Sequence, residues 1–146
     1  MIAPPPIIYL AALIFSLLFS WLVPVPFMLG WLGILIGLAL MALGLIIAQA
    51  AFRELSRHKT PPDPTKPTMK VVQEGVFRFS RNPIYLAFTL IYLGFAFAFN
   101  SPWALVFLVP VLVVIDRGQI PREEKCLARK FGEEYFRYKV KVRRWI

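Results

Sequence analysis

Long uncharged, apolar stretches alternate along the chain with short charged segments. Residues 1–52 contain no Asp, Glu, Lys, Arg or His, and neither do residues 83–115. A helix of about 17–25 apolar residues crosses the hydrocarbon core of a bilayer. The pattern therefore predicts an all-α fold, an integral membrane helical bundle of four transmembrane helices arranged as two hairpins. We place these helices at about residues 7–23, 27–52, 83–99 and 102–115.

Short links rich in turn-forming residues separate the two helices of each predicted hairpin. Pro24 and Pro26 follow the first apolar run, and the sequence Asn-Ser-Pro occupies residues 100–102. The first run has the apolar character of a secretory signal as well. No basic residue precedes it and no small-residue cleavage pattern follows Trp21, so we interpret it as a membrane span.

Four glycines lie in the second apolar run, and two of them have the spacing of a helix-packing motif. Gly33 and Gly37 are four residues apart, which lets another helix approach the backbone closely. The partner is either another helix of the same bundle or the same face of a second chain. We favour packing within one bundle, and a homodimer is the alternative.

The charge distribution predicts the orientation of the helices. The chain has 17 basic and 8 acidic residues, a net charge of +9, and all of them fall in residues 53–82 or 116–146. Lys and Arg near the ends of spans mark the cytoplasmic side, and the links at residues 24–26 and 100–102 are uncharged. We therefore expect a multi-pass protein with both termini in the cytoplasm. At 146 residues it is too short for two globular domains, so we treat residues 1–146 as a single membrane domain.

The two charged segments differ in their predicted structure. The first, residues 53–82, is proline-rich and is expected to be an extended cytoplasmic loop. The second, residues 116–146, predicts a helix that starts at Pro121 and ends near Gly132, followed by an amphipathic basic helix from Glu133. Such a segment suits an anionic membrane surface, so we expect membrane lipids rather than nucleic acid as its partner.

Glu124 is a charged residue on an otherwise apolar helix face. Leu127, Ala128 and Phe131 follow it at positions that share its side of the helix. The carboxylate either supports the helix start and pairs with Arg117 or Arg122, or it holds a cation or an amino group in a pocket. The sequence leaves both interpretations open.

Several kinds of site find no support in the sequence. His58 is the only histidine and lies between Arg57 and Lys59, so we expect it to be solvated and predict no metal site. Cys126 is the only cysteine, which excludes an intramolecular disulfide. The chain has neither a Walker loop nor the Gly-x-Gly-x-x-Gly pattern.

Three motifs in the second half of the chain resemble a known family of membrane enzymes. They read Gly-x-Phe-Arg-x-Ser-Arg-Asn-Pro-x-Tyr at residues 75–85, Glu-Glu-x-x-Leu-x-x-x-Phe-Gly-x-x-Tyr-x-x-Tyr at residues 123–138 and Val-Arg-Arg-Trp at residues 142–145. This combination is similar to the isoprenylcysteine carboxyl methyltransferase and phospholipid methyltransferase family, in its small prokaryotic form. The resemblance implies a protein of the plasma (inner) membrane of a prokaryote.

The resemblance also implies a cofactor, S-adenosylmethionine, and a set of residues that hold it. The family commonly has His where this chain has Asn82, and an amide cannot carry a proton as an imidazole can. Arg143 and Arg144 are candidates for the headgroup of the substrate in the catalytic site, or else they anchor the chain at the cytoplasmic face. The implied cofactor-binding residues are Arg81, Asn82, Pro83, Tyr85, Leu86, Gly94, Glu123, Glu124 and Tyr138.

Three functions are compatible with these features. The first is methyl transfer from S-adenosylmethionine to a lipophilic small-molecule substrate, through a carboxylate, thiol or amine of a prenylated or lipid-like molecule at the cytoplasmic face. The second is a membrane reductase of the sterol reductase type, which uses a nicotinamide cofactor and carries a similar Arg, Pro and Tyr stretch. The third is a non-enzymatic four-helix membrane protein whose basic tail binds lipid or a partner. The methyl acceptor itself is not determined by the sequence, nor is the choice between Glu123 and Glu124 as the cofactor contact.

Overall fold

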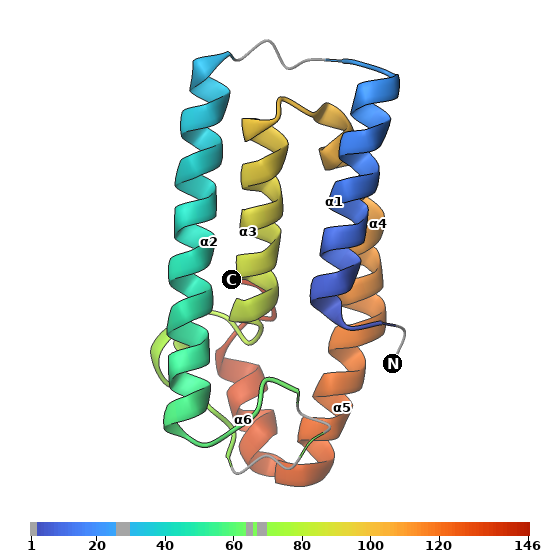
Figure 1. Ribbon diagram of the computed structural model, residues 1–146. Helices are drawn as coiled ribbons and strands as arrows, with labels where there is room; N and C mark the ends of the chain where they lie inside the picture. Colours follow the sequence, from blue (N-terminus) through green and yellow to red (C-terminus); the bar gives the residue numbers. More distant parts are fainter. Residues whose placement is uncertain (1–2, 26–29, 64–65, 67–69) are drawn as a thin grey trace.

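The computed structural model describes residues 3–25, 30–63, 66 and 70–146, and all its regular elements are helices. Four long helices run side by side, and the shorter helices gather at one end of the bundle (Figure 1). The all-α prediction is therefore confirmed for the described part of the chain. The elements are α1 (Pro5–Leu22), α2 (Trp31–Arg57), the 3₁₀ helix η1 (Gly75–Arg78), α3 (Pro83–Ala98), α4 (Pro102–Val114), the π-helix η2 (Ile115–Gln119), α5 (Ile120–Phe131) and α6 (Glu133–Lys141).

Three helical segments among the described residues are long and apolar enough to cross a membrane. They are α1, α2 and the 30-residue segment Pro102–Phe131. Helix α3 has 16 residues and is apolar but shorter than that. Many large apolar side chains of α1 and α2 face outward, as expected for helices surrounded by lipid. The chain is thus a membrane protein, and the count of four spans stays a prediction.

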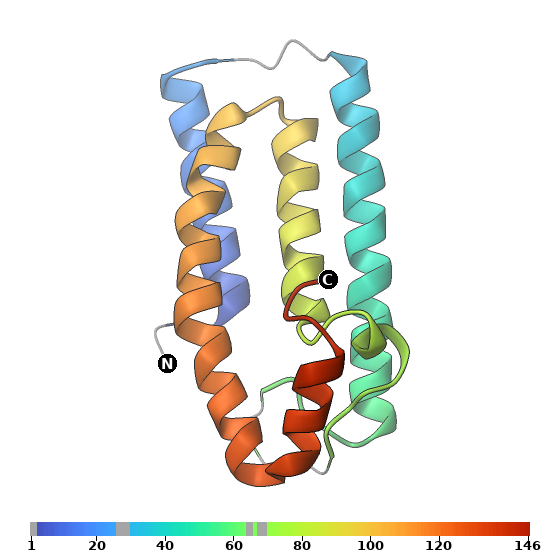
Figure 2. The same cartoon turned by 180° about the vertical axis from the view of Figure 1, so that it is seen from behind.

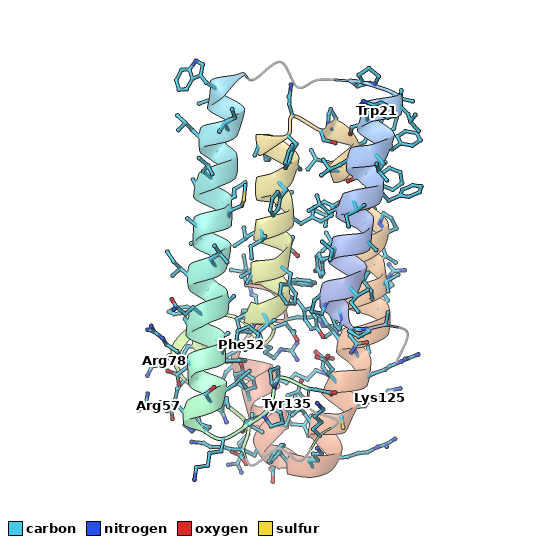
Figure 3. All side chains as sticks on the ribbon, viewed as in Figure 1. Trp21, Phe52, Arg57, Arg78, Lys125 and Tyr135 are labelled. Carbon is cyan, nitrogen blue, oxygen red and sulfur yellow. The ribbon has the colours of Figure 1, made fainter. Side chains whose placement is uncertain are left out.

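The two ends of the bundle differ in chemistry, as the charge pattern predicts. Arg57, Arg78 and Lys125 lie at the end that carries α5 and α6, whereas Trp21 lies at the opposite end (Figure 3). Trp21 is 81% exposed, which is appropriate for an aromatic side chain at a membrane interface. The start of the second predicted span, at residue 27, and part of the link before it lie outside the described residues.

The packing partners of the helices are not the neighbours expected from two hairpins. Helix α2 packs along α3, and α1 packs along α4, while α1 and α2 have no extensive contact with each other. The arrangement as two hairpins is therefore not confirmed. The choice of partner follows the small residues, because helices in lipid associate where their backbones can approach closely.

Glycines on α2 and α3 make the closest of these approaches. A Cβ atom at Gly37 would lie 2.5 Å from the carbonyl oxygen of Gly94, and one at Gly44 would lie 2.8 Å from the carbonyl oxygen of Ala87. Gly33 is also buried. Gly37 therefore packs within the bundle, as we favoured, and is not available as the face of a homodimer.

The fourth apolar run and the first C-terminal helix form one continuous helical segment. We expected a break between residue 115 and Pro121, but α4, η2 and α5 follow one another without interruption. Pro121 lacks an N–H and its ring would clash with a carbonyl one turn earlier in a regular α-helix. The wider π-helical turn of η2 directly before it relieves this clash, and the helix continues.

A cluster of buried side chains lies at the charged end of the bundle. It joins the charged end of α2 to the segment before η1 and to α6. Val71 and Val72 are buried here, so residues 70–74 form an extended segment that is packed against the protein. The cluster consists of Ala51, Leu55, Val71, Val72, Phe77, Tyr135 and Tyr138.

His58 is not solvated, so that prediction is wrong. Its side chain is only 15% exposed and lies between Glu54 and Glu74. Helix α2 continues to Arg57, five residues beyond the predicted span, and this extension brings His58 against the segment that precedes η1. The local sequence did not predict this burial, because His58 has a basic residue on each side.

We predict that Gly37→Leu destabilises the protein by about 1–3 kcal/mol or more, because the added side chain must displace the α3 backbone. Thermal unfolding in detergent, followed by circular dichroism, measures the change. Ala39→Leu is the matched control, since Ala39 lies on an exposed face of the same helix. Equal midpoints for the two variants would show that the contact between α2 and α3 is not tight.

Candidate active site

A cavity of about 640 Å³ lies at the charged end of the bundle, where α1, α2, α3 and α5 approach one another. One side of the cavity is apolar and includes Pro5, Phe52 and Phe88. The other side carries polar and charged groups from the start of α3 and from α5. A cavity of this volume is in the range of small-molecule and cofactor sites. The polar lining residues include Arg81, Asn82, Tyr85, Gln119, Glu123, Glu124, Tyr135 and Tyr138.

The buried ion pair between Arg81 and Glu124 forms the centre of the polar side. Arg81 Nη1 donates to Glu124 Oε1 over 2.8 Å, and both side chains are about one-tenth exposed. Arg144 Nη2 donates to Glu124 Oε2 over 3.0 Å, and Lys139 Nζ lies 3.8 Å from the same oxygen. The partners of Glu124 therefore come from other segments, and of the two interpretations left open the one that pairs it with Arg117 or Arg122 does not describe its contacts.

The C-terminal tail is attached to the start of α3 through its backbone. The N–H of Arg81 donates to the carbonyl of Arg143 over 3.0 Å, and Asn82 Nδ2 donates to the carbonyl of Arg144 over 3.0 Å. Both views place the tail beside the first turn of α3 (Figure 2). Asn82 thus has a clear structural role here, since its amide holds the tail.

Asp116, in the π-helix η2, also binds the C-terminal tail. Its Oδ1 accepts from Trp145 Nε1 over 2.9 Å and from Arg144 Nη1 over 3.2 Å. Partial burial opposes the charge of Arg144, but the hydrogen bonds to Glu124 and Asp116 outweigh it and raise the pKa of the guanidinium. Arg144 is therefore a permanent cation between two carboxylates.

Two tyrosines of α6, Tyr135 and Tyr138, line the cavity together with Arg81. Tyr138 donates its hydroxyl hydrogen to the carbonyl of Phe77 over 2.6 Å, and Tyr135 accepts from Arg81 Nη1 over 3.4 Å. Burial raises the pKa of both phenols above the usual range. Both stay neutral, so they serve as hydrogen-bonding and packing groups rather than as charged groups.

Glu123 differs from Glu124 in having no cationic partner. Tyr85 donates its hydroxyl hydrogen to Glu123 Oε1, and Gln119 Nε2 donates to the same oxygen over 3.0 Å. In the described parts of the chain no Lys, Arg or His nitrogen lies within ion-pair distance of this carboxylate. Glu123 therefore presents a carboxylate to the cavity that only neutral groups hold in place.

Seven of the nine residues implied as cofactor contacts line this cavity, and the other two do not. Leu86 is absent from its lining, and Gly94 lies further along α3, against Gly37 of α2. Arg143 and Arg144 do not line it either, because the tail passes behind the Arg81 ion pair. The roles of all these residues in binding stay predictions. The seven are Arg81, Asn82, Pro83, Tyr85, Glu123, Glu124 and Tyr138.

Three residues of the site were missed by the reasoning from sequence. Gln119 stands four residues before Glu123, a spacing that places both on one helix face. Asp116 is the first charge after 34 uncharged residues, which marks it as a special position. Tyr135 belongs to the second motif, but of the two tyrosines in that motif only Tyr138 was predicted to contact the cofactor.

A family profile and a curated relative both link the chain to membrane methyltransferases. The sequence profile described as phospholipid methyltransferase matches residues 32–134. The Protein-S-isoprenylcysteine O-methyltransferase of Saccharomyces cerevisiae is 31% identical over 114 residues, which cover 78% of this chain and 46% of the yeast protein. An uncharacterized protein of Haemophilus influenzae is 43% identical over 63 residues, which cover 43% of this chain and 100% of that protein. No solved structure matches.

The chain thus spans about half the length of its yeast relative. The matched profile extends from α2 to the start of α6 and includes Arg81, Glu123 and Glu124. It covers more than half of the chain and contains the polar side of the cavity. This chain belongs to the phospholipid methyltransferase family.

Proposed function

We propose that the chain transfers a methyl group from S-adenosylmethionine to a lipophilic acceptor in the cavity at its charged end. The acceptor group is a carboxylate, thiol or amine of a prenylated or lipid-like molecule. The observation that carries the proposal is the unneutralised Glu123 carboxylate, which faces a cavity that is polar on one side and apolar on the other. Family membership favours methyl transfer over the reductase and the non-enzymatic function.

The polar groups of the cavity fit the charges of S-adenosylmethionine. Its ammonium and sulfonium groups are cationic, and Glu123 is a carboxylate that has no cationic partner within the described protein. Its carboxylate needs a donor, and the buried Nε of Arg81 has no hydrogen-bond partner there. A buried donor without a partner is uncommon in proteins, which supports a ligand at this position. When bound, the cofactor would supply an electrophilic methyl group.

The apolar side of the cavity suits a lipid-like acceptor. Pro5 of α1, Phe52 of α2 and Phe88 of α3 all line it. We propose that the acceptor enters from the bilayer between α1 and α2, which have no extensive contact with each other. The names of the family and of the yeast relative both refer to lipophilic substrates.

The protein would contribute mainly by positioning the reactants and by excluding water. Methyl transfer to a carboxylate or thiolate requires no proton transfer, so alignment of the two reactants supplies much of the rate. The hydrogen bonds from Tyr85 and Gln119 fix the orientation of Glu123. The ion pairs of Glu124 hold the tail behind the cavity and fix the position of Arg81 in its lining.

Binding of S-adenosylmethionine tests the proposal directly. We expect the purified chain in detergent to bind S-adenosylmethionine in a calorimetric titration and to bind NADPH much more weakly. Thermal unfolding gives a second readout, because a ligand that binds the folded state raises the midpoint. Absence of S-adenosylmethionine binding under several lipid conditions would contradict the proposal.

We predict that Glu123→Gln weakens S-adenosylmethionine binding by about 10- to 100-fold, because it removes a charge-assisted interaction of about 1.5–3 kcal/mol. The unfolding midpoint should stay close to that of the unchanged protein, since Gln retains an oxygen that accepts from Tyr85 and Gln119. Titration calorimetry measures the affinity. Unchanged affinity would exclude Glu123 as the cofactor contact.

Glu124→Gln should act mainly on stability instead. It leaves the guanidinium groups of Arg81 and Arg144 without their shared carboxylate, and breaking a buried ion pair in this way costs about 3–5 kcal/mol. Thermal or denaturant unfolding in detergent measures the loss. A stable Glu124→Gln protein with impaired binding would reverse the roles that we assign to the two glutamates.

We also propose that the charged end faces the cytoplasm, with both termini there, in the plasma membrane of a prokaryote. In a Cys126→Ser background, Trp21→Cys should react with a membrane-impermeant maleimide added to intact cells. Lys125→Cys should react only after permeabilisation. Both positions are exposed, so the reagent can reach each of them. The reverse pattern would invert the proposed topology.

A further inference from the structure

A second polar cluster lies outside the cavity, where the end of α2 meets the segment before η1. Glu54 and His58 are one helical turn apart, and Glu74 directly precedes η1. His58 Nε2 lies 3.7 Å from Glu54 Oε2 and 3.3 Å from Glu74 Oε2. One nitrogen and two carboxylate oxygens all lie within 4.8 Å of one another. None of the three residues lines the cavity.

Two of these three atoms are buried without a hydrogen-bond partner. They are Glu54 Oε2 and His58 Nε2. An unpaired buried polar atom costs about 1–3 kcal/mol, so such atoms are usually satisfied by a protein group, a water molecule or an ion. The contact between His58 and Glu74 is short enough for a hydrogen bond, but its geometry leaves Nε2 unpaired.

The two distances from His58 are close to those between the ligands of a tetrahedral metal ion, and all three ligand atoms lie within 4.8 Å of one another. Zinc binds imidazole nitrogen and carboxylate oxygen at about 2.0–2.2 Å, which places two tetrahedral ligands about 3.3–3.6 Å apart. The distances from His58 Nε2 to its two carboxylate neighbours are 3.3 and 3.7 Å. Little movement of side chains would be needed to bring all three atoms to one ion.

The surrounding residues orient the two carboxylates. Arg57 Nη1 lies 3.6 Å from Glu54 Oε1, and Lys70 Nζ lies 3.7 Å from Glu74 Oε1. Each carboxylate therefore directs one oxygen to a cation and the other to His58, an arrangement common around metal ligands.

Gly75 lets the chain bring Glu74 close to α2. It has a φ angle of +61°, and a Cβ atom there would lie 2.8 Å from Glu54 Cγ. Any other residue would be strained and would push the segment away from Glu54. The close approach of the two carboxylates is thus built into the backbone.

We propose that Glu54, His58 and Glu74 bind a divalent transition-metal ion of the zinc type, with water in the fourth position. The ion would link the end of α2 to the segment that continues through η1 to Arg81. The prediction of no metal site is revised accordingly. The sequence signal was the spacing of four between Glu54 and His58, which places both on one helix face. This site is independent of the proposed methyl transfer.

Zinc titration of the full chain tests this site. We expect the tag-free protein in detergent, after treatment with a chelator, to bind one zinc ion per chain in titration calorimetry with ZnCl₂. Glu54→Gln, His58→Gln and Glu74→Gln should each weaken the affinity at least about tenfold. Zinc should raise the unfolding midpoint of the unchanged protein and have little effect on Glu74→Gln.

Two control variants separate this site from adventitious binding. Glu133→Gln removes an exposed carboxylate that also has a partner one turn away, Arg137, and Cys126→Ser removes the only thiol. Both should bind zinc as the unchanged protein does. Glu74 is 44% exposed, so its replacement by Gln should not unfold the protein. Absence of zinc binding, binding unaffected by Glu54→Gln and Glu74→Gln, or binding lost in Cys126→Ser would overturn the proposal.

Discussion

The structure depends on one buried carboxylate. Glu124 is 8% exposed, and an ionised group in such a position is stable only with close partners. Arg81, from the start of α3, and Arg144, from the C-terminal tail, supply them. The tail must therefore fold back over the end of the bundle, and Asn82 and Asp116 hold it in that position. This pairing also fixes Arg81 and Glu124 in the polar lining of the cavity.

The adjacent glutamate has the opposite environment. Both glutamates line the cavity, but consecutive residues of a helix point in directions about 100° apart, and only Glu124 also reaches the cations Arg81 and Arg144. One carboxylate is neutralised by protein cations and the other is held only by the neutral groups of Tyr85 and Gln119. A pair of acidic residues in the sequence thus separates into a structural group and a group available to a ligand.

Helix packing sets the shape of the rest of the cavity. The small residues of α2 and α3 bring these two helices into close contact, while α1 packs on α4. The first turn of α1 and the last turns of α2 consequently face each other across apolar space at the charged end. In lipid, where apolar burial does not drive association, such close backbone contacts decide which helices become neighbours.

Length and polarity along the chain determined the helices and the chemical difference between the two ends, because a helix in a bilayer satisfies its own backbone and needs only an apolar surface. The motifs around Arg81 and Glu123 also contain polar residues that the structure brings together in the lining of one cavity, while their roles in binding stay predictions. Tertiary structure alone decided which groups contact one another. Glu124 pairs with Arg144 rather than Arg117, and Gly94 packs against Gly37 instead of lining the cavity. His58 lies beside two carboxylates. These contacts join segments distant in sequence, and their geometry depends on how the chain folds back, which spacing along the chain does not encode.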